Sequence, residues 1–193
     1  MGFTFTPLDL QGVLLVEPDT YRDDRGFFRE TFKASAFRSG GVGDAFMQSN
    51  VSRSSAGVLR GLHFQSPPAD VAKLVSVVQG RIFDVVADVR RDSPTLGGWV
   101  GAELSAVDGR SLFVPEGFAH GFVALEDDTV VTYLMTGEFS PQHDTGVRWD
   151  DPDLGIDWPV AAPILSEKDR ALPTLRQIHA GTRIDRTAEE ATL

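Results

Sequence analysis

Two short segments of the chain each set one histidine among glycines and apolar residues. His63 and Arg60 lie within residues 57–65, and His120 lies within residues 115–122. Imidazole titrates near neutral pH, so either histidine could exchange a proton with a ligand. Glycines at this density let the backbone or a ligand approach closely. A single histidine in apolar sequence is, however, more often a hydrogen-bonded core residue, and these residues alone leave both interpretations open.

Three further places carry polar side chains that suit catalysis but also have an ordinary structural interpretation. Lys73 opens an apolar strand, where it is either a solvated strand end or a cation that points into a cavity. Tyr133 lies in an apolar run, where core packing with a satisfied hydroxyl is its common role. The charged run at residues 166–170 is typical of a solvated surface. None of the three identifies a function by itself.

Composition excludes several classes of site and partner. The 193 residues contain no cysteine, so disulfides, zinc–thiolate sites and thiol nucleophiles are ruled out. There are four histidines, and Phe64 and Gln65 follow His63 in place of another histidine, so we predict no metal site. The net charge of −10 disfavours binding to nucleic acid or to an anionic membrane, because both need a basic surface.

The elements that must position these side chains are short β-strands. From about residue 45 to residue 136, β-rich runs are interrupted by Gly, Pro, Asp and Ser at intervals of roughly eight to twelve residues, which is typical of a sandwich or barrel. We predict strands at residues 12–18, 45–52, 72–79, 81–90, 98–104, 111–114, 119–125 and 129–135. Short helices are expected at residues 33–39 and 167–172, the second capped by Ser166. Gly80 and residues 115–117 suit tight strand connections.

The fold class that follows is all-β, a jelly roll with a few short peripheral helices and a cavity between its sheets that can hold a small ligand. We expect one domain over residues 1–175 and a polar C-terminal tail over residues 176–193. The apolar runs are too short to span a membrane, and residues 1–12 lack the features of a secretory signal. The default location is therefore the cytoplasm.

Seven motifs occur in the order and at the spacing of one enzyme family. They are residues 24–30 (DRGFFRE), 48–50 (QSN), 57–65 (GVLRGLHFQ), 93–95 (SPT), 115–122 (PEGFAHGF), 150–152 (DDP) and 166–170 (SEKDR). Over about residues 5–175 the chain thus resembles the dTDP-4-dehydrorhamnose 3,5-epimerases. The resemblance implies a homodimer with a cupin-like double-stranded β-helix, which inverts C3 and C5 of a 4-keto-6-deoxy sugar on thymidine diphosphate without a cofactor.

The resemblance also implies a role for each polar residue. His63 matches the catalytic base and Asp169 its carboxylate partner, while Lys73 matches the cation that stabilises an enolate oxygen. Tyr133 matches the donor that returns a proton to the opposite face of the sugar. Other substrate-binding positions of the family match Arg25, Glu30, Gln48, Ser49, Asn50, Arg60, His120, Asp144, Lys168 and Arg170. Asp144 stands where the family has glutamate and Phe64 where it has tyrosine, and neither change removes a catalytic group.

Three other functions remain to be weighed. A single-centre epimerase, acting at C3 or at C5 alone, would use the same base and acid. A catalytically silent sugar-nucleotide binding module would be expected to lack His63, Asp169 or Tyr133, and the chain has all three. A metal-dependent cupin enzyme would need a histidine cluster that the sequence does not contain.

Overall fold

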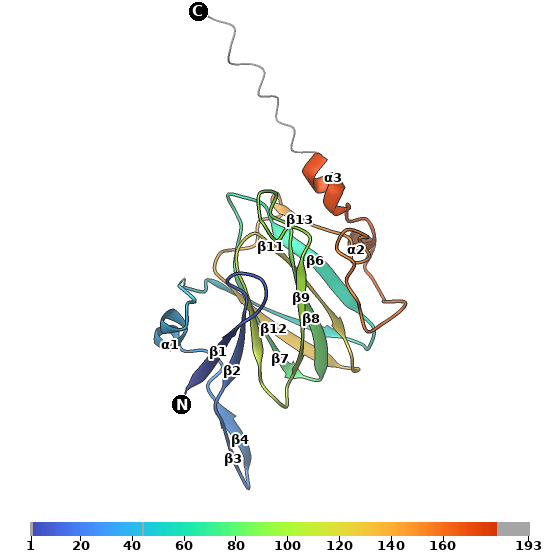
Figure 1. Cartoon of the computed structure of the whole chain (residues 1–193). Coiled ribbons are helices and arrows are strands. Elements are labelled where there is room, and N and C mark those ends of the chain that lie inside the picture. The colour runs from blue at the N-terminus through green and yellow to red at the C-terminus, as the bar shows by residue number, and fades with distance from the viewer. Residues whose placement is uncertain (1, 44, 181–193) are drawn as a thin grey trace, which may run out of the picture.

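The computed structural model describes residues 2–43 and 45–180, and within them most strands form two antiparallel sheets packed face to face (Figure 1). The first sheet has the order β1 (Phe3–Pro7), β2 (Leu14–Pro18), β10 (Ser111–Val114), β7 (Lys73–Gln79), β12 (Thr129–Met135) and β5 (Gln48–Ser54). The second has the order β13 (Asp144–Gly146), β6 (Leu59–Gln65), β11 (Phe118–Ala124), β8 (Arg81–Asp88) and β9 (Trp99–Ser105). The predicted all-β jelly roll is confirmed.

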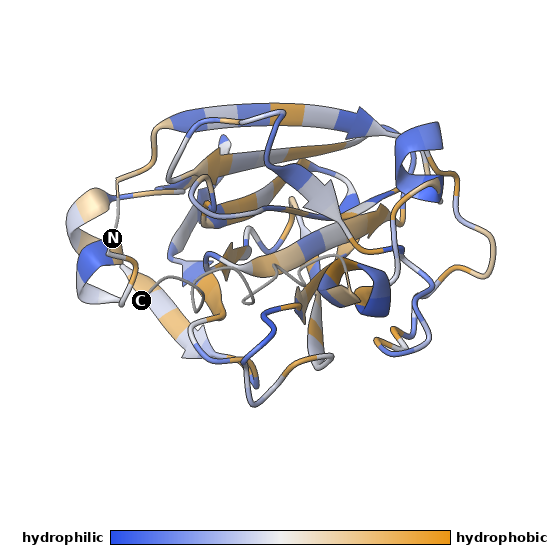
Figure 2. Ribbon diagram, turned by 90° about the horizontal axis from the view of Figure 1, so that it is seen from above, coloured by the Kyte–Doolittle hydropathy of each residue, from blue (hydrophilic) through white to orange (hydrophobic). Residues whose placement is uncertain are grey.

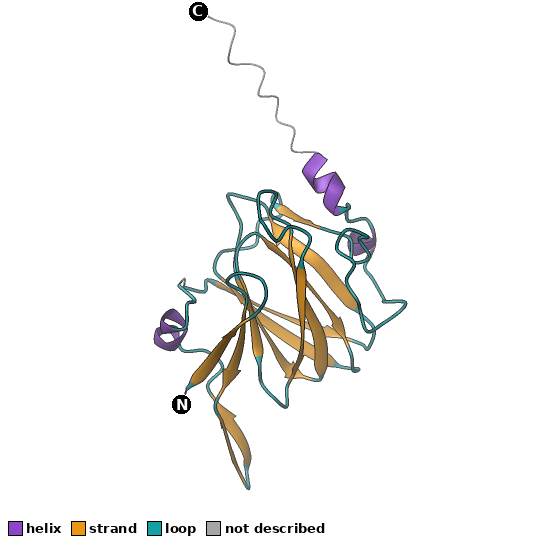
Figure 3. Cartoon of the chain, viewed as in Figure 1, coloured by secondary structure: helices purple, strands orange, loops and turns teal. Residues whose placement is uncertain are grey.

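The remaining elements lie at the periphery of the two sheets (Figure 3). A hairpin of β3 (Thr20–Asp23) and β4 (Gly26–Arg29) extends away from the body of the molecule. The helices are α1 (Ala34–Ser39), α2 (Glu167–Arg170) and α3 (Leu175–Ala180). In the described part of the chain, no helix is long and apolar enough to cross a membrane.

The core between the sheets follows from the alternation of side chains along each strand, which Figure 2 shows as alternating hydrophobic and hydrophilic bands. Val75 and Val77 of β7 point inward and pack in one cluster with Ile82 and Val86 of β8. The intervening Leu74, Ser76 and Val78 face outward. Burying the inward side chains stabilises the fold by about 1.5–3 kcal/mol for each large aliphatic residue.

The five-stranded sheet is covered on its outer face as well. All seven residues of β11 are buried, because the C-terminal part of the chain folds back over this sheet. Val147, Leu154, Trp158 and Leu175 supply the covering side chains. This arrangement fixes the course of the C-terminal segment and, with it, the position of α2.

The predicted strands are observed with ends displaced by a few residues, and residues 111–114 and 129–135 match without displacement. The helix expected at residues 167–172 is observed over Glu167–Arg170, with the Ser166 side chain accepting a hydrogen bond from the Asp169 backbone N–H. Strand β6 was not predicted, because Arg60, Gly61 and His63 break the alternation of apolar and polar residues that marks a strand.

The C-terminal tail expected over residues 176–193 is described only in its first part. Residues up to Ala180 belong to α3, whose Leu175 and Ile178 pack in the cluster beneath the five-stranded sheet. Residues 181–193 lie outside the described residues. The ordered body of the protein therefore includes α3.

Strands β6 and β11 approach each other unusually closely at two glycines. A Cβ atom on Gly61 would lie 2.5 Å from the Gly121 Cα, and one on Gly121 would lie 2.8 Å from the Arg60 carbonyl oxygen. Gly61 also has a φ of 129°, a conformation that other residues rarely adopt. Because His63 pairs with His120 just beyond this contact, the two glycines set the spacing of the two histidines.

A buried carboxylate fixes the end of β8. Asp88 accepts hydrogen bonds from Arg90, Ser93 and Thr95, and the Arg90 guanidinium lies 4.0 Å from the centre of the Phe118 ring. Although burial opposes it, these hydrogen bonds hold the pKa of Asp88 far below its usual range. The motif at residues 93–95 therefore has a structural role in this protein.

We predict that Gly121→Ala lowers the free energy of unfolding by about 1–3 kcal/mol, because the new methyl group meets backbone atoms that cannot withdraw. Gly43→Ala is the matched control, since a Cβ at Gly43 meets nothing within 4 Å. Urea denaturation of both variants measures the difference. Equal stability of the two variants would contradict the close contact between β6 and β11.

Candidate active site

A cavity opens between the inner faces of the two sheets and has two connected parts. Their volumes are about 280 and 290 Å³, and both are lined by His63, Lys73, Tyr133 and Lys168. The first part is completed by Ser52, Arg60, His120, Phe122, Ser166 and Asp169. The second is completed by Gln48, Asn50, Phe64, Gln65, Met135, Phe139 and Asp144. Most of the residues singled out in the sequence therefore meet in one place.

His63 and Asp169 form the hydrogen bond at the centre of the cavity. His63 Nε2 lies 2.5 Å from Asp169 Oδ1, although 106 residues separate them in the chain. The His63 side chain is 28% exposed and the Asp169 side chain 5%. Burial works to raise the pKa of Asp169, but hydrogen bonds from His63 and Ser166 and the nearby charge of Lys168 bring that pKa below its usual value. The carboxylate is therefore ionised and able to stabilise an imidazolium.

Lys73 places a cation beside this pair. Its Nζ donates a hydrogen bond of 3.2 Å to the backbone carbonyl of His63. Burial lowers the pKa of Lys73 to about 8, and the negative charges of Asp144 and Asp84 oppose that fall. Of the two interpretations that the sequence allowed, the structure shows the inward-pointing cation.

Tyr133 lies on the wall opposite His63. It belongs to β12 of the six-stranded sheet, whereas His63 belongs to β6 of the five-stranded sheet. Within the described residues its hydroxyl has no hydrogen-bond partner, so it is available to a ligand in the cavity. Burial raises the pKa of Tyr133, with the nearby Arg60 charge acting against the rise, and the group is therefore a neutral phenol at physiological pH.

A second histidine–carboxylate pair lies beside the first. His120 Nε2 is 2.7 Å from Asp84 Oδ1, and the two side chains are 8% and 0% exposed. His120 also lines the cavity, so it is both a hydrogen-bonded buried residue and a candidate substrate contact. Asp84 was not identified as a site residue from sequence. Its signal was a carboxylate on an inward position of an otherwise apolar strand.

Amide, aromatic and charged groups surround the cavity mouth. Gln48 and Asn50 project inward from β5, and the Gln48 side chain accepts a hydrogen bond from the Phe139 backbone N–H. Phe139 lines the cavity and is half exposed, a feature that sequence reasoning missed. Lys168 and Asp144 form an ion pair at the junction of the two parts of the cavity. Arg60 donates a hydrogen bond of 3.1 Å to Ser54 Oγ.

Four predicted binding residues do not reach this cavity within the chain. Ser49 faces outward, because it alternates along β5 with the inward Gln48 and Asn50. Arg170 lies on the exposed side of α2, where its guanidinium bonds to the Leu165 carbonyl. Arg25 is at the tip of the β3–β4 hairpin, paired with Asp23, and Glu30 follows that hairpin.

Comparison with known proteins gives a consistent result. A family model described as dTDP-4-dehydrorhamnose 3,5-epimerase matches residues 7–177. The chain is 48% identical over 178 residues to the dTDP-4-dehydrorhamnose 3,5-epimerase of Methanothermobacter thermautotrophicus, covering 91% of this chain and 96% of that protein.

Solved structures agree in fold as well as in sequence. A dTDP-6-deoxy-D-glucose-3,5-epimerase from Legionella pneumophila, in complex with dTDP-4-keto-L-rhamnose, matches with a TM-score of 0.89 and 41% identity over 93% of this chain and 96% of that one. A 3′-monoepimerase from Streptomyces bikiniensis, in complex with dTDP-quinovose, matches with a TM-score of 0.85 and 36% identity over 90% of this chain and 89% of that one.

We predict that Lys73 titrates at about pH 8, well below the ordinary lysine value of 10.5, because burial disfavours its charged form. Its ¹³Cε chemical shift, assigned by loss of the signal in Lys73→Arg, measures this directly. In Asp144→Asn the titration should move to still lower pH, since a charge that favours the ammonium form is removed. A midpoint near 10.5 would show that the ammonium group is solvated.

Proposed function

The chain belongs to the dTDP-4-dehydrorhamnose 3,5-epimerase family, and on that basis we propose that His63 and Tyr133 invert its substrate from opposite walls of the cavity. The reaction converts dTDP-4-dehydro-6-deoxy-D-glucose to dTDP-4-dehydro-L-rhamnose by inversion at C3 and C5. The observation that carries the assignment of roles is the placement of a carboxylate-paired imidazole on one sheet and an unpaired phenol on the other.

Proton removal is assigned to His63. The C4 ketone makes the hydrogens on C3 and C5 acidic, because the electrons of a broken C–H bond delocalise onto the carbonyl oxygen. His63 accepts that proton and becomes an imidazolium, which the ionised Asp169 stabilises across 2.5 Å. The enolate oxygen then carries the negative charge. The buried ammonium of Lys73 is the cation placed to stabilise it, and removal of bulk water strengthens that interaction.

Proton return is assigned to Tyr133. Its phenol transfers a proton to the carbanion carbon on the face opposite His63, and the ketone reforms as the enolate electrons move back. The phenolate then regains a proton from solvent while His63 releases the one that it accepted, so the enzyme returns to its initial state. Two such cycles, one at each carbon, give the double inversion. The positive charge of Arg60 favours the transient phenolate.

The groups at the cavity mouth are assigned to the nucleotide. Arg60 and Lys168 supply positive charge for the diphosphate, although the protein as a whole carries a net charge of −10. Gln48 and Asn50 offer amide donors and acceptors, and the exposed ring of Phe139 offers a flat apolar surface for a base. His120, held by Asp84, is assigned to the sugar.

We predict that His63→Ala reduces exchange of the C3 and C5 protons by about a thousandfold, because the base is lost. Tyr133→Phe should retain exchange but lose inversion, since protons return only from the side of His63. Deuterium incorporation from D2O, read by NMR, measures both variants. His143→Ala is the control, as His143 pairs with Ser140 outside the cavity.

Two outcomes would change the proposal. Wild-type exchange in His63→Ala would remove His63 as the base. Deuterium at only one carbon in the wild-type protein would make the chain a single-centre enzyme, like the 3′-monoepimerase that shares its fold.

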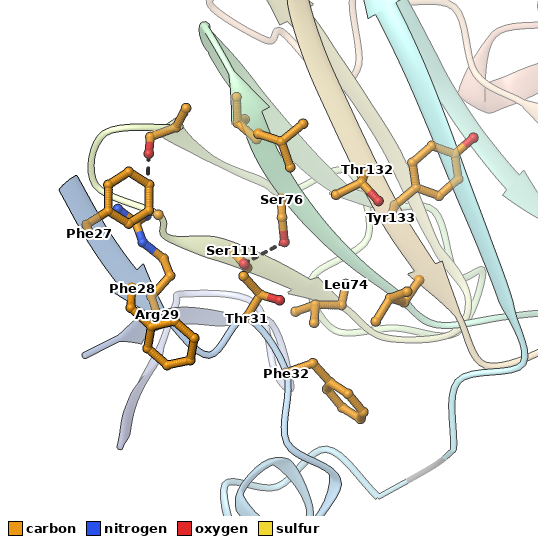
Figure 4. Close-up of a pocket in the computed structure, with 15 residues that line it drawn as sticks. Phe27, Phe28, Arg29, Thr31, Phe32, Leu74, Ser76, Ser111, Thr132 and Tyr133 are labelled. Carbon is orange, nitrogen blue, oxygen red and sulfur yellow. Dashed lines mark hydrogen bonds between the residues drawn. The ribbon is translucent and has the colours of Figure 1, made fainter. Parts of the chain in front are cut away.

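We also propose that the working unit is a homodimer, formed through the outer face of the six-stranded sheet. A groove of about 420 Å³ lies between that face and the β3–β4 hairpin (Figure 4). Phe27 and Phe28 on the hairpin are 54% and 60% exposed, and Val78 on β7 is 58% exposed. Exposed apolar side chains gathered on one face are typical of a protein interface.

The position of Arg25 supports the same assembly. Its side chain is 89% exposed at the turn between β3 and β4, and it does not line the cavity of its own chain. In a dimer built on the outer sheet face, the hairpin of one protomer would bring Arg25 and Glu30 to the cavity mouth of the partner. The predicted nucleotide contacts of these two residues would then be made between protomers.

We predict that mixing the weakly active variants Arg25→Ala and His63→Ala restores about a quarter of the wild-type activity. Half of randomly formed dimers are hybrids, and one of the two sites in each hybrid is intact. Activity after incubation of the mixture measures this. Val78→Asp should give a monomer by light scattering, whereas Ile164→Asp, which is 55% exposed away from the groove, should not. No recovery on mixing would place Arg25 outside the partner's site.

A further inference from the structure

The hydroxyl of Ser166 contacts the catalytic carboxylate in two ways. Ser166 Oγ accepts a hydrogen bond of 3.0 Å from the Asp169 backbone N–H. The same hydroxyl donates a hydrogen bond of 2.8 Å to Asp169 Oδ2. One side chain thus holds both the backbone and the carboxylate of Asp169. Ser166 also lines the cavity itself.

The direction of the second hydrogen bond is fixed. Because the ionised Asp169 carboxylate has no proton to give, the Ser166 hydroxyl is the donor to Asp169 Oδ2, while one of its lone pairs accepts the backbone N–H. That oxygen is therefore an occupied acceptor, and Asp169 Oδ1 is the oxygen that faces His63. With Asp169 only 4% exposed, water has little access to replace the hydroxyl.

The neighbouring helix α3 shows what the same sequence pattern does when no catalytic group is involved. Thr174 caps α3 as Ser166 caps α2, and each accepts a hydrogen bond from the backbone N–H three residues later. In α3 the third residue, Gln177, reaches back to the Thr174 backbone N–H at 2.8 Å, which is the reciprocal arrangement expected of a capping box.

In α2 the corresponding side chain is directed elsewhere. The Asp169 carboxylate contacts His63 and the Ser166 hydroxyl, and no bond from it to the Ser166 backbone N–H occurs among the described residues. The start of α2 therefore has the serine half of a capping box, whereas the Asp169 side chain contacts His63 in the cavity. The Ser166 hydroxyl is the other side-chain group bonded to the carboxylate in this orientation.

We propose that Ser166 is a positioning residue of the epimerase, which acts on His63 through Asp169. The inference rests on the assignment of His63 and Asp169 as the base and its partner. Ser166 fixes the rotation of the carboxylate and keeps Oδ1 on the line to His63 Nε2, so that the imidazole meets the sugar in one orientation. Its role is exerted through Asp169, and no covalent chemistry is assigned to it.

The other ionisable groups of the cavity come from different elements and do not contact the Ser166 hydroxyl. They are Arg60 of β6, Lys73 of β7, Asp84 of β8, His120 of β11, Tyr133 of β12, Asp144 of β13 and Lys168 of α2. Replacing Ser166 therefore removes no hydrogen-bond partner of theirs among the described residues. A change in the pH dependence of a Ser166 variant therefore reports on the His63–Asp169 pair.

The experiment compares Ser166→Ala, Ser166→Thr and Thr174→Ala in the full chain with dTDP-4-dehydro-6-deoxy-D-glucose. We expect kcat of Ser166→Ala to fall about ten- to a hundredfold with KM little changed, since orientation of the base is lost while the nucleotide contacts stay. The acidic limb of its pH–rate profile should move to higher pH, because Asp169 loses a donor to its ionised form. Ser166→Thr restores the hydroxyl and should recover most of the rate.

Thr174→Ala separates this role from helix capping, because it removes the equivalent cap of α3 without touching the catalytic pair. Its kcat and pH profile should match those of the wild-type protein, even where its melting temperature falls as much as that of Ser166→Ala. An unchanged kcat in Ser166→Ala, or equal losses in Ser166→Ala and Thr174→Ala, would overturn the proposal.

The result also distinguishes failure of this inference from failure of the assigned chemistry. If His63→Ala abolishes exchange while Ser166→Ala leaves it intact, the base assignment stands and the positioning role is wrong. If His63→Ala leaves exchange intact, both are wrong. Proton NMR gives an independent measure, since the imidazole N–H that bonds to Asp169 should give a downfield signal that shifts or broadens in Ser166→Ala and persists in Thr174→Ala.

Discussion

The cavity between the two sheets takes several ionisable side chains out of bulk water, and each has to be stabilised there by a neighbour. An unpaired buried ion costs several kcal/mol, so the arrangement of partners is as constrained as the arrangement of catalytic groups. Asp169 is held by His63 and Ser166, Asp84 by His120, and Asp144 by Lys168. Lys73 meets this requirement only partly, and burial therefore lowers its pKa to about 8.

Three separate parts of the chain supply the ionisable side chains of the cavity and their partners. The six-stranded sheet provides Lys73 and Tyr133, and the five-stranded sheet provides His63 and His120. The C-terminal segment, anchored by its apolar contacts to the outer face of the five-stranded sheet, provides the carboxylate. The close contact of β6 and β11 at their glycines then brings the two histidines side by side. Tyr133 and His63 lie on opposite walls because they belong to opposite sheets.

Whether a feature of this structure could be predicted from the sequence depends on the physical signal that its residues carry. Apolar alternation located strands such as residues 129–135, because burial on one face imposes it directly. Apolar alternation did not locate β6, because Arg60 and His63 face the cavity and break the pattern that burial would impose. The motif at residues 48–50 groups Ser49 with Gln48 and Asn50, but side chains alternate along the strand, so Ser49 points away from the cavity. The partner of His120 was missed because Asp84 becomes its neighbour only when two distant strands pair.

Helix α2 lies late in the chain, after every strand of both sheets. During synthesis, the residues that form the sheets leave the ribosome before the residues that form α2. A nascent chain that has paired its strands thus has His63, Lys73 and Tyr133 but not the carboxylate that bonds to His63. The order of the sequence therefore delays assembly of the His63–Asp169 pair until the C-terminal segment has folded over the five-stranded sheet.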